Sequence, residues 1–549
     1  MTSTSPASAP APSQELRDNY YYGIESFGAL CATTESVCIA DPNWKPKQDG
    51  TWTVGKRLAV VGRHPITKYM GFHSFPPDQD LARMLVDILK KSGLPWNGFN
   101  VLRIGDGDLD GDLPVKMLIQ VDRQVDWEAG MRLAHDCRSL MQDKFDLDEV
   151  RSRPAPPPRP FWWPAEKVAQ YGPMDESLLL TTLLGQCLAT APDAGRGSSG
   201  FYLRITTRSK QYNCLFTCSH VVLDKAAKSG INLLSKNSTG DNGIEVIQPA
   251  CLTELEHELR LILKNEGANI DKWDGRDPGG LTEFYREKDE NLKDLLKHCE
   301  QRRGNNKIGY VLLAPRATAH LAGDKTSFHR DWAAIDLDMS KFESNTLPKN
   351  EICVADLPLS AKLRMSATGQ GSSFNGNSFK IAKPNSVSWK ITIDHYIDTG
   401  SLEDRLKDAK DNGSPLEVFK YGFATQLTQG HLNGIPFVAN SSGAYTQSMC
   451  IIGFKEPSLP FKDPGTSFNV KGDSGSLVTL LCHHKDKAKG VKAVAAGLLW
   501  GGDGGGGLLN RSYVSYATPL GWVLEDVKKC FSESSDDEVV VDNLTLWDG

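Results

Sequence analysis

Long apolar runs, a leader-like N-terminus and an excess of positive charge are all lacking in this sequence of 549 residues. No stretch of about 18 apolar residues occurs, which excludes an ordinary membrane-spanning helix. The N-terminus has no basic start followed by an apolar run, and no arginine precedes Arg17, so we expect neither a secretory signal nor an organelle transit peptide. The net charge of -6 gives no basic field that would favour nucleic acid as a partner.

Paired cysteines are lacking too. The twelve cysteines are scattered singly, without a CxxC pair, which favours free or buried thiols in a reducing compartment over a disulfide framework or a zinc site. We therefore expect an intracellular protein, cytoplasmic or nuclear, with no metal ion and no cofactor. Residues 106–112 resemble the beginning of an EF-hand calcium loop. Met117 stands where a bidentate glutamate is required, so a hairpin turn is favoured.

The length and the changes of composition along the chain predict several units. Residues 1–18 are rich in Ser, Ala and Pro and are expected to form a disordered tail. Residues 19–150 mix strand-like apolar runs with helical spacing, which predicts an α+β N-terminal domain. Residues 151–177 are expected to be a Pro-rich linker. Their proline run at 154–160 favours a stiff spacer but also matches the PxxPx+ pattern that adaptor domains read.

The rest of the sequence has the texture of an all-β fold. Residues 178–531 contain many short apolar runs separated by Gly, Asn and Ser, which predicts a sandwich or barrel. Within this range, leucines at helical spacing amid heavy charge predict a helical insertion at about residues 225–305. Residues 532–549 are acidic and are expected to be a flexible tail. Alternatively, the valines at 539–541 could add a strand to a partner's sheet edge.

A candidate nucleophile lies in the segment KGDSGSLV, residues 471–478. A nucleophilic serine needs a tight, exposed turn and N–H donors directed at the place where a carbonyl oxygen becomes negatively charged. Gly472 and Gly475 permit backbone conformations that a side chain would obstruct, and the apolar run that follows would hold the turn. Ser474 is therefore the candidate nucleophile, although the same string read alone also fits an ordinary polar turn.

His220 and Asp331 are the candidate base and the acid that orients it. A serine hydroxyl needs a base at neutral pH, and His220 alone among the twelve histidines ends an apolar, strand-like run. Asp331 comes just before another apolar run, where its carboxylate could accept an imidazole N–H and fix the tautomer. Asp331 is favoured over its neighbours because a strand follows it with little interruption. The competing acids are Asp324, Asp336 and Asp338.

Together these segments resemble the chymotrypsin-like (trypsin-like) serine proteases, in the chain order His, Asp, Ser. The resemblance covers roughly residues 178–531, and GLLWG at 497–501 is similar to the family's substrate-binding strand. It implies a multidomain chain with an N-terminal α+β domain and then an all-β chymotrypsin-like double β-barrel carrying the helical insertion. It also implies peptide hydrolysis through an acyl-enzyme, with the N–H groups of Gly472 and Ser474 as the oxyanion hole.

The sequence departs from the secreted members of this family. Val221 and Val470 stand where those members carry disulfide-forming cysteines, which agrees with the intracellular interpretation. No segment like Ile-Val-Gly-Gly precedes the first barrel, so activation by a newly cut N-terminus that pairs with Asp473 is not supported. Asp473 would therefore need another partner, or the site would be ordered by substrate or by the N-terminal domain.

Five residues are expected to bind substrate. Ungapped counting back from the candidate serine puts Phe468 at the base of the primary pocket and Asn469 beside it. Leu499, Trp500 and Gly501 belong to the expected substrate strand, with Leu499 replacing the family's serine. Neither residue at the pocket base is acidic, so a preference for Arg or Lys lacks its counter-charge. We expect an apolar or medium-sized residue before the cleaved bond.

The sequence thus predicts an intracellular serine endopeptidase that acts on a protein or peptide substrate, with adaptor binding through the linker as a further hypothesis. A catalytically silent protease-fold protein that serves as a binding module or scaffold is the rival from another class, because the activation segment is missing. A third interpretation is a protease that mainly cleaves itself, in the linker around residues 151–164.

Overall fold

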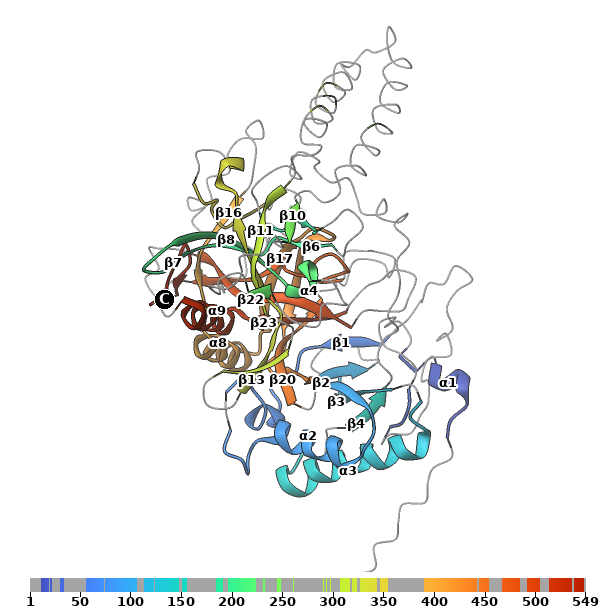
Figure 1. The fold of residues 1–549 in the computed structure, drawn as a ribbon. Coiled ribbons are helices and arrows are strands. Elements are labelled where there is room, and N and C mark those ends of the chain that lie inside the picture. The colour runs from blue at the N-terminus through green and yellow to red at the C-terminus, as the bar shows by residue number, and fades with distance from the viewer. Residues whose placement is uncertain are drawn as a thin grey trace, which may run out of the picture.

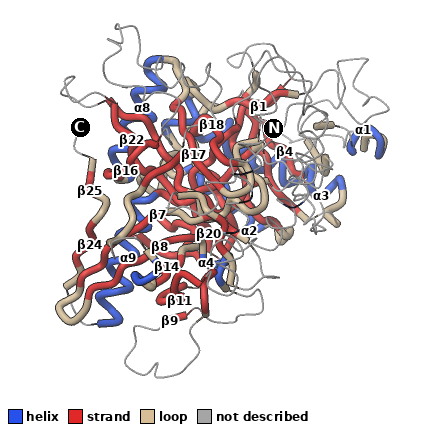
Figure 2. The backbone as a smooth tube through the Cα atoms, turned by 90° about the horizontal axis from the view of Figure 1, so that it is seen from above, coloured by secondary structure: helices blue, strands red, loops and turns tan. Residues whose placement is uncertain are grey.

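The structure is a computed structural model of residues 1–549, shown in Figures 1 and 2. The residues that it describes are 11–18, 20–21, 30–33, 56–73, 75–105, 113–122, 124–147, 151–155, 184–190, 196–223, 231–232, 244–247, 260, 290, 293, 297, 307–315, 318–322, 326–342, 346–353, 390–441, 444–453, 467–483, 491–503, 513–535 and 538–547.

The N-terminal part combines a sheet with helices. Its elements are α1 (Gln14–Asp18), β1 (Arg57–Ala59), a 3-10 turn (Pro65–Lys68), α2 (Leu81–Lys91), β2 (Trp96–Gly105), β3 (Val115–Val121), α3 (Trp127–Phe145) and β4 (Arg151–Ala155). Strand β2 pairs antiparallel with β1 and β3, and β4 pairs in parallel with β3. Helices α2 and α3 lie together against this sheet (Figure 1) and bury a shared apolar core.

Both helices begin and end where their sequences dictate. The Asp80 carboxylate accepts the Arg83 N–H at the start of α2, and Asp126 accepts the Ala129 N–H at the start of α3. Helix α3 ends at Asp146, whose φ of 54° lies in the left-handed region that stops helices. Apolar residues at helical spacing then turn one face of each helix toward the sheet, as the sequence pattern predicts.

A first β-unit follows in the chain. Its elements are β7 (Phe201–Thr206), β8 (Gln211–Thr217), α4 (Ser219–Val222), β9 (Ile231–Asn232), β10 (Glu245–Ile247), β11 (Lys307–Ala314) and β14 (Ala333–Leu337), with the late strand β24 (Val540–Asp542). The strand order is β10-β11-β14-β8-β7-β24, and β9 also pairs with β11. Before β7 lies the short pair β5 (Cys187–Leu188) and β6 (Gly197–Ser198).

The second β-unit is a closed barrel. Its six strands are β17 (Leu416–Gly422), β18 (Gln426–Leu432), β20 (Ala444–Gly453), β21 (Leu477–His483), β22 (Val491–Gly502) and β23 (Val514–Pro519). The other elements of this part of the chain are β12 (Thr318–Ala322), β13 (Thr326–Arg330), a 3-10 turn (Met339–Lys341), β15 (Glu351–Cys353), β16 (Lys390–Tyr396), α8 (Thr399–Asn412), β19 (Phe437–Ser441), α9 (Leu520–Ser535) and β25 (Thr545–Leu546). The antiparallel pairings run β22-β21-β17-β18-β20-β23 and return to β22, which closes six strands on themselves.

One apolar core connects the two β-units. Phe201 and Phe216 of the first unit stack with ring centroids 4.8 Å apart, and the buried Trp332 packs beside Phe216. The same cluster continues through Leu477 and Leu498 of the closed barrel to α9. The predicted multidomain chain with a β-barrel is thus confirmed in the coarse sense of a mixed α and β structure that contains a six-stranded antiparallel barrel.

The N-terminal sheet is continuous with the closed barrel. Strand β2 pairs with β19 through Phe99 and Val438, and β19 pairs with the barrel strand β20. The buried Asn433 accepts the Val61 N–H at 2.8 Å and donates to the Val101 carbonyl at 2.9 Å. Backbone pairing and a satisfied buried amide therefore hold the two parts together.

Three expected boundary segments differ from the prediction. Residues 14–18 of the expected disordered tail form α1, and the expected linker begins with β4, an edge strand, which is a position that tolerates Pro154. The acidic C-terminal segment is not a flexible tail in its described residues. It forms β24 on β7 and β25 on β16 (Figure 2), with Leu544 and Trp547 buried, Val539 and Val541 partly buried against the core, and Val540 exposed.

Most of the other segment predictions fall on residues that the structure leaves undescribed. The expected insertion at residues 225–305 lies largely outside the described residues, apart from β9, β10 and four helical positions. The acidic run at 106–112 and most of the proline run also lie outside them. In the described part of the chain, no helix is long and apolar enough to cross a membrane.

A buried polar chain joins the N-terminal sheet to strand β22 of the barrel. The Asn100 amide donates to the Tyr516 hydroxyl at 2.7 Å, and Tyr516 donates to the Asp503 carboxylate. Burial raises the pKa of Asp503 to about 7, and the Tyr516 hydrogen bond only partly opposes this rise. The other Asp503 oxygen has no partner among the described residues, which suits a protonated carboxyl.

Asp503→Asn should change how stability depends on pH. From about pH 4 to pH 7 the unfolded chain loses the Asp503 proton while the folded chain keeps it, so this group makes the folded state less stable as pH rises. We therefore compare the free energy of unfolding of the variant with that of wild type, by denaturant titration at pH 5 and at pH 8. The difference, variant minus wild type, should be on the order of 2 kcal/mol larger at pH 8 than at pH 5. Asp404→Asn, at an exposed position, is the control, and an equal difference at both pH values would contradict the prediction.

Candidate active site

The register of two strands brings His220 and Asp331 together. His220 lies in α4, shortly beyond the end of β8, while Asp331 lies just before β14. Strands β8 and β14 are antiparallel, with Ala333 opposite Thr217. The end of one strand therefore meets the beginning of the other, and the predicted base and acid lie on the same edge of the sheet.

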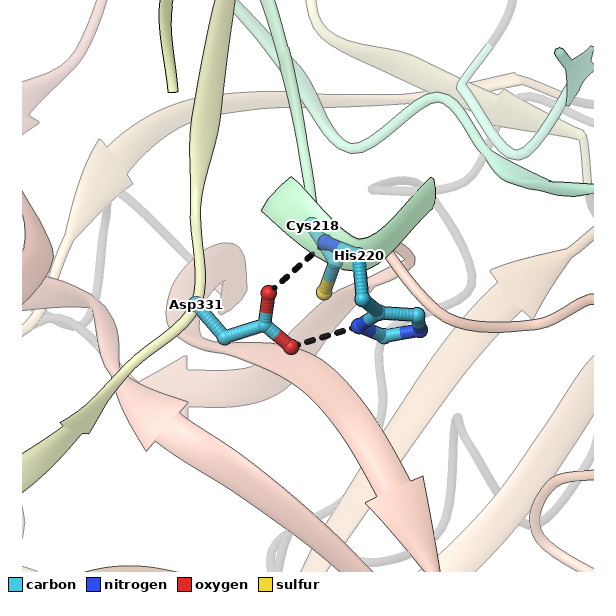
Figure 3. Close-up of side chains that lie close together, drawn as sticks. All are labelled: Cys218, His220 and Asp331. Carbon is cyan, nitrogen blue, oxygen red and sulfur yellow. Dashed lines mark hydrogen bonds and ion pairs between the residues drawn. The ribbon is translucent and has the colours of Figure 1, made fainter. Parts of the chain in front are cut away.

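Asp331 holds His220 with both carboxylate oxygens. The Asp331 Oδ2 lies 2.6 Å from His220 Nδ1, and Oδ1 accepts the His220 backbone N–H at 3.1 Å (Figure 3). The Ser219 hydroxyl donates to the same Oδ1 at 2.6 Å. The Asp331 side chain is 3% exposed and the His220 ring 46% exposed, so a buried acid orients a histidine whose ring solvent can reach.

The environment keeps Asp331 ionised. Burial alone would raise the pKa of Asp331, but the charge of His220, its hydrogen bond and smaller contributions, among them the Ser219 hydrogen bond, together outweigh burial and hold that pKa well below its usual range. The neighbouring His329 is buried, and burial lowers its pKa, so it stays neutral at neutral pH. Because its pKa is held low, Asp331 is ionised and carries the negative charge beside His220 and His329.

Ser474 lies in a tight turn whose glycines the packing requires. Gly472 and Gly475 have φ values of 108° and 95°, in the region that favours glycine. A methyl group on Gly475 would lie 2.2 Å from the Thr217 hydroxyl and 2.4 Å from the Ser198 carbonyl. The turn therefore packs directly against the end of β8, close in the chain to His220.

Further contacts connect the Ser474 turn to the segment that carries His220. A methyl group on Gly197 would touch both Val221 Cγ2, at 2.3 Å, and the Ser474 carbonyl, at 2.8 Å. Leu499 O accepts both the Gly475 N–H at 2.7 Å and the Cys218 thiol at 3.1 Å. The Ser474 hydroxyl itself donates to the Trp500 carbonyl at 3.4 Å. All three predicted residues thus lie on neighbouring segments, and the hydrogen-bonded pair among them is His220 with Asp331.

The N–H groups of this turn divide into two sets. Those of Asp473, Gly475 and Ser476 donate to the carbonyls of Val470, Leu499 and Asp473 respectively. Among the described residues, those of Gly472 and Ser474 have no acceptor. Two unused donors, the N–H of Gly472 and that of Ser474 itself, therefore lie in this turn, at the positions expected of an oxyanion hole.

The residues expected to bind substrate take different places. Phe468 and Leu499 are fully buried in the core, and Phe468 packs closely on Gly430 of β18. The Asn469 amide donates to the Gly501 carbonyl at 2.8 Å. Trp500 is partly buried, and its ring lies 4.2 Å from that of His329, centroid to centroid. A methyl group on Gly501 would meet no described atom within 4 Å apart from its chain neighbours, so the space beside this glycine is open.

Cys218, His220 and Asp331 also form a compact set of potential metal ligands, with ligand atoms within 4.8 Å of one another (Figure 3). A thiol must lose its proton to bind a metal well. Burial raises the pKa of Cys218 well above its usual value, and the thiol donates to a backbone carbonyl. The donor set therefore fits a hydrogen-bonded His–Asp pair with a packed thiol better than a metal centre.

Two residues that support the site were missed by the sequence interpretation. The Ser198 hydroxyl donates to the Gly472 carbonyl at 2.9 Å and accepts the Phe423 N–H at 2.9 Å, and its own N–H donates to the Ser474 carbonyl at 2.7 Å. Lys420 lies fully buried beside Asp473. Ser198 carries no local signal. Lys420 stands within the apolar run VFKYG, but this does not by itself outweigh the ordinary tendency of a strand lysine to face solvent.

Ser198→Ala should destabilise the protein by about 1–3 kcal/mol, because it leaves the Phe423 N–H and the Gly472 carbonyl without partners. The measurement is the free energy of unfolding by denaturant titration. Ser414→Ala removes an exposed hydroxyl and should change this free energy by less than about 0.5 kcal/mol. Equal values for the two variants would show that Ser198 does not secure the turn.

No protein-family model and no curated protein matches this sequence. Among solved structures, the chain is similar to a glutamic-acid-specific serine protease that uses a histidine triad in substrate binding. That likeness has a TM-score of 0.25 and 10% sequence identity, and it covers 63% of this chain and 97% of the other.

Proposed function

We propose that this chain is a serine endopeptidase with a chymotrypsin-like double β-barrel, in which the first β-unit and the closed barrel together carry a His220–Asp331–Ser474 triad. The observation that carries the proposal is the 2.6 Å His220–Asp331 pair packed beside a glycine-supported serine turn with two unused N–H donors. An ordinary polar turn has no need of a buried acid aimed at an adjacent histidine, so the combination favours catalysis over a silent scaffold.

The proposed reaction assigns one task to each group. Ser474 Oγ attacks the carbonyl carbon of the substrate while its proton passes to His220 Nε2, and the carbonyl electrons move to oxygen. The N–H groups of Gly472 and Ser474 bind that oxyanion. Collapse of the intermediate breaks the C–N bond, and the leaving amine takes the proton from His220. Water, deprotonated by His220, then attacks the acyl carbon; the bond from that carbon to Ser474 Oγ breaks, the carboxylic acid leaves, and Ser474 Oγ takes the proton back from His220.

Asp331 supports both halves of this reaction without being protonated. Its Oδ2 accepts from Nδ1, which leaves Nε2 to act as the base. The imidazolium that forms after proton transfer is then stabilised by a carboxylate 2.6 Å away.

The proposal extends to substrate and compartment. Trp500 and Gly501, the two expected substrate-binding residues that are not buried in the core, are both uncharged, which favours an apolar or medium-sized residue before the cleaved bond. The cysteines that the structure describes are buried and form no disulfide with one another, which favours a reducing, intracellular location. Adaptor binding by the proline run remains a sequence prediction.

Ser474→Ala and His220→Ala should each reduce covalent labelling by a fluorophosphonate probe by at least about 10³-fold, because the first lacks the nucleophile and the second its base. In-gel fluorescence of purified protein is the measurement. His73→Ala, a substitution in the N-terminal part, is the matched control and should label like wild type. Wild-type protein that shows no Ser474-dependent labelling would favour the scaffold, whereas labelling with loss of full-length chain would favour self-cleavage.

Asp331→Asn should slow labelling by roughly 10⁴-fold while leaving the fold intact, because an amide can stabilise the wrong imidazole tautomer. The rate of probe incorporation, with unfolding temperature measured alongside, tests this. Asp336→Asn is the control, since the Asp336 side chain lies within β14 and 3.8 Å from Lys210 on the surface. If Asp336→Asn caused the larger loss, the assignment of the orienting acid would be wrong.

A further inference from the structure

Asp473, the residue before the candidate nucleophile, is a fully buried carboxylate. Its Oδ1 accepts the N–H groups of Ala424 and Thr425, at 2.9 and 3.1 Å. Its Oδ2 accepts the Val470 N–H at 3.0 Å and the Thr425 hydroxyl at 2.7 Å. This carboxylate therefore ties the beginning of the serine turn to the loop that follows β17.

Lys420 supplies the positive charge for this carboxylate. Its side chain is fully buried in the closed barrel, with Nζ 3.1 Å from Asp473 Oδ2. The same ammonium donates to the Thr425 hydroxyl, and it lies 5.8 Å from the centroid of the Phe468 ring. The lysine comes from the middle of β17, whose pairing with β21 places it opposite Val478. Its position is thus set by the barrel and not by a mobile terminus.

Strand β17 is shaped to approach the carboxylate. A methyl group at Gly422 would lie 2.4 Å from Asp473 Oδ1 and 2.6 Å from the Ser476 hydroxyl. The absence of a side chain there allows the strand and the serine turn to touch. Gly422 and Lys420, which lie on the same side of one strand, therefore both face Asp473.

The Asp473 carboxylate is saturated by these contacts. A carboxylate has about four lone-pair sites, and Asp473 receives three N–H groups, one hydroxyl and one ammonium. No acceptor site is left for a second ammonium. Removal of Lys420 would leave a buried negative charge without its counter-ion, which is strongly destabilising and forces local rearrangement.

We propose that Lys420 is a positioning residue whose ammonium orders the Gly472–Ser474 turn through Asp473, so that the intact chain has a formed oxyanion site without a newly cut N-terminus. This inference rests on the proposed serine endopeptidase function. The sequence contains no Ile-Val-Gly-Gly-like segment whose new N-terminus could pair with Asp473, and the inference assigns that pairing to the Lys420 ammonium. Activity would then require no proteolytic cut to supply the cation that Asp473 needs.

The test compares wild type, Lys420→Met, and the double variant Lys420→Met/Asp473→Asn. Methionine preserves length and removes charge, and the double variant also removes the unpaired carboxylate. The single variant should lose about 10²–10³-fold in the rate of Ser474 labelling by a fluorophosphonate, the loss expected when an oxyanion donor is misplaced. The double variant should recover part of it. Lys407→Met, at an exposed position, should label like wild type.

Two measurements distinguish positioning from a merely structural role. Hydrogen exchange of residues 470–476 should be faster in folded Lys420→Met than in wild type, while exchange in α3 is unchanged. Intact mass after labelling should show one probe on the full-length, uncut wild-type chain, which requires no variant to fold. Labelling confined to shortened chains would overturn the inference. A folded Lys420→Met variant that is labelled and exchanges hydrogen at the same rates as wild type would overturn it too.

Failure of the proposed function would look different. If wild type shows no Ser474-dependent labelling, the endopeptidase proposal fails, and hydrogen exchange alone decides whether Lys420 orders the turn. If wild type labels and Lys420→Met labels equally well, the endopeptidase proposal stands and the positioning role fails.

Discussion

The site depends on one constraint: a carboxylate buried in a protein core must be matched by donors and positive charge. Two such carboxylates lie near the Ser474 turn. Asp331 is matched by His220, Ser219 and a backbone N–H, whereas Asp473 is matched by Lys420 and the loop after β17. Each match fixes a different half of the candidate site, because the first orients His220 and the second holds the turn that carries Ser474.

The two halves come from different β-units, and glycines allow them to meet. Gly197 and Gly475 are the points where the segment bearing His220 and the serine turn approach within atomic contact. Ser198 then links them, because its hydroxyl and its N–H donate to the Gly472 and Ser474 carbonyls of the turn, while its own carbonyl accepts the Thr217 hydroxyl at 2.8 Å. The relative placement of His220 and Ser474 therefore follows from the packing of the two units and not from either sheet alone.

Sequence patterns were informative about residues next to the ends of strands and uninformative about polar residues buried within them. His220 and Asp331 could be predicted because each lies at the rim of an apolar run, and the pairing of β8 with β14 joins those rims. Lys420 escaped because a charge inside a strand ordinarily faces solvent, and its partner Asp473 lies far along the chain. The acidic C-terminal segment was mispredicted because composition hides the valines that complete the edge of β7.

The N-terminal part belongs to the support of the site. Its strand β2 extends the barrel sheet through β19, and its Asn100 reaches Asp503 through Tyr516. Asp503 directly follows the strand that also carries Trp500 and Gly501, both expected to bind substrate. Any force that shifts β2 must therefore either break this buried polar chain or move the substrate strand with it. A loosely tethered module would leave Asn100 and Tyr516 without buried partners, so the contacts themselves require the N-terminal sheet to stay docked while the site is formed.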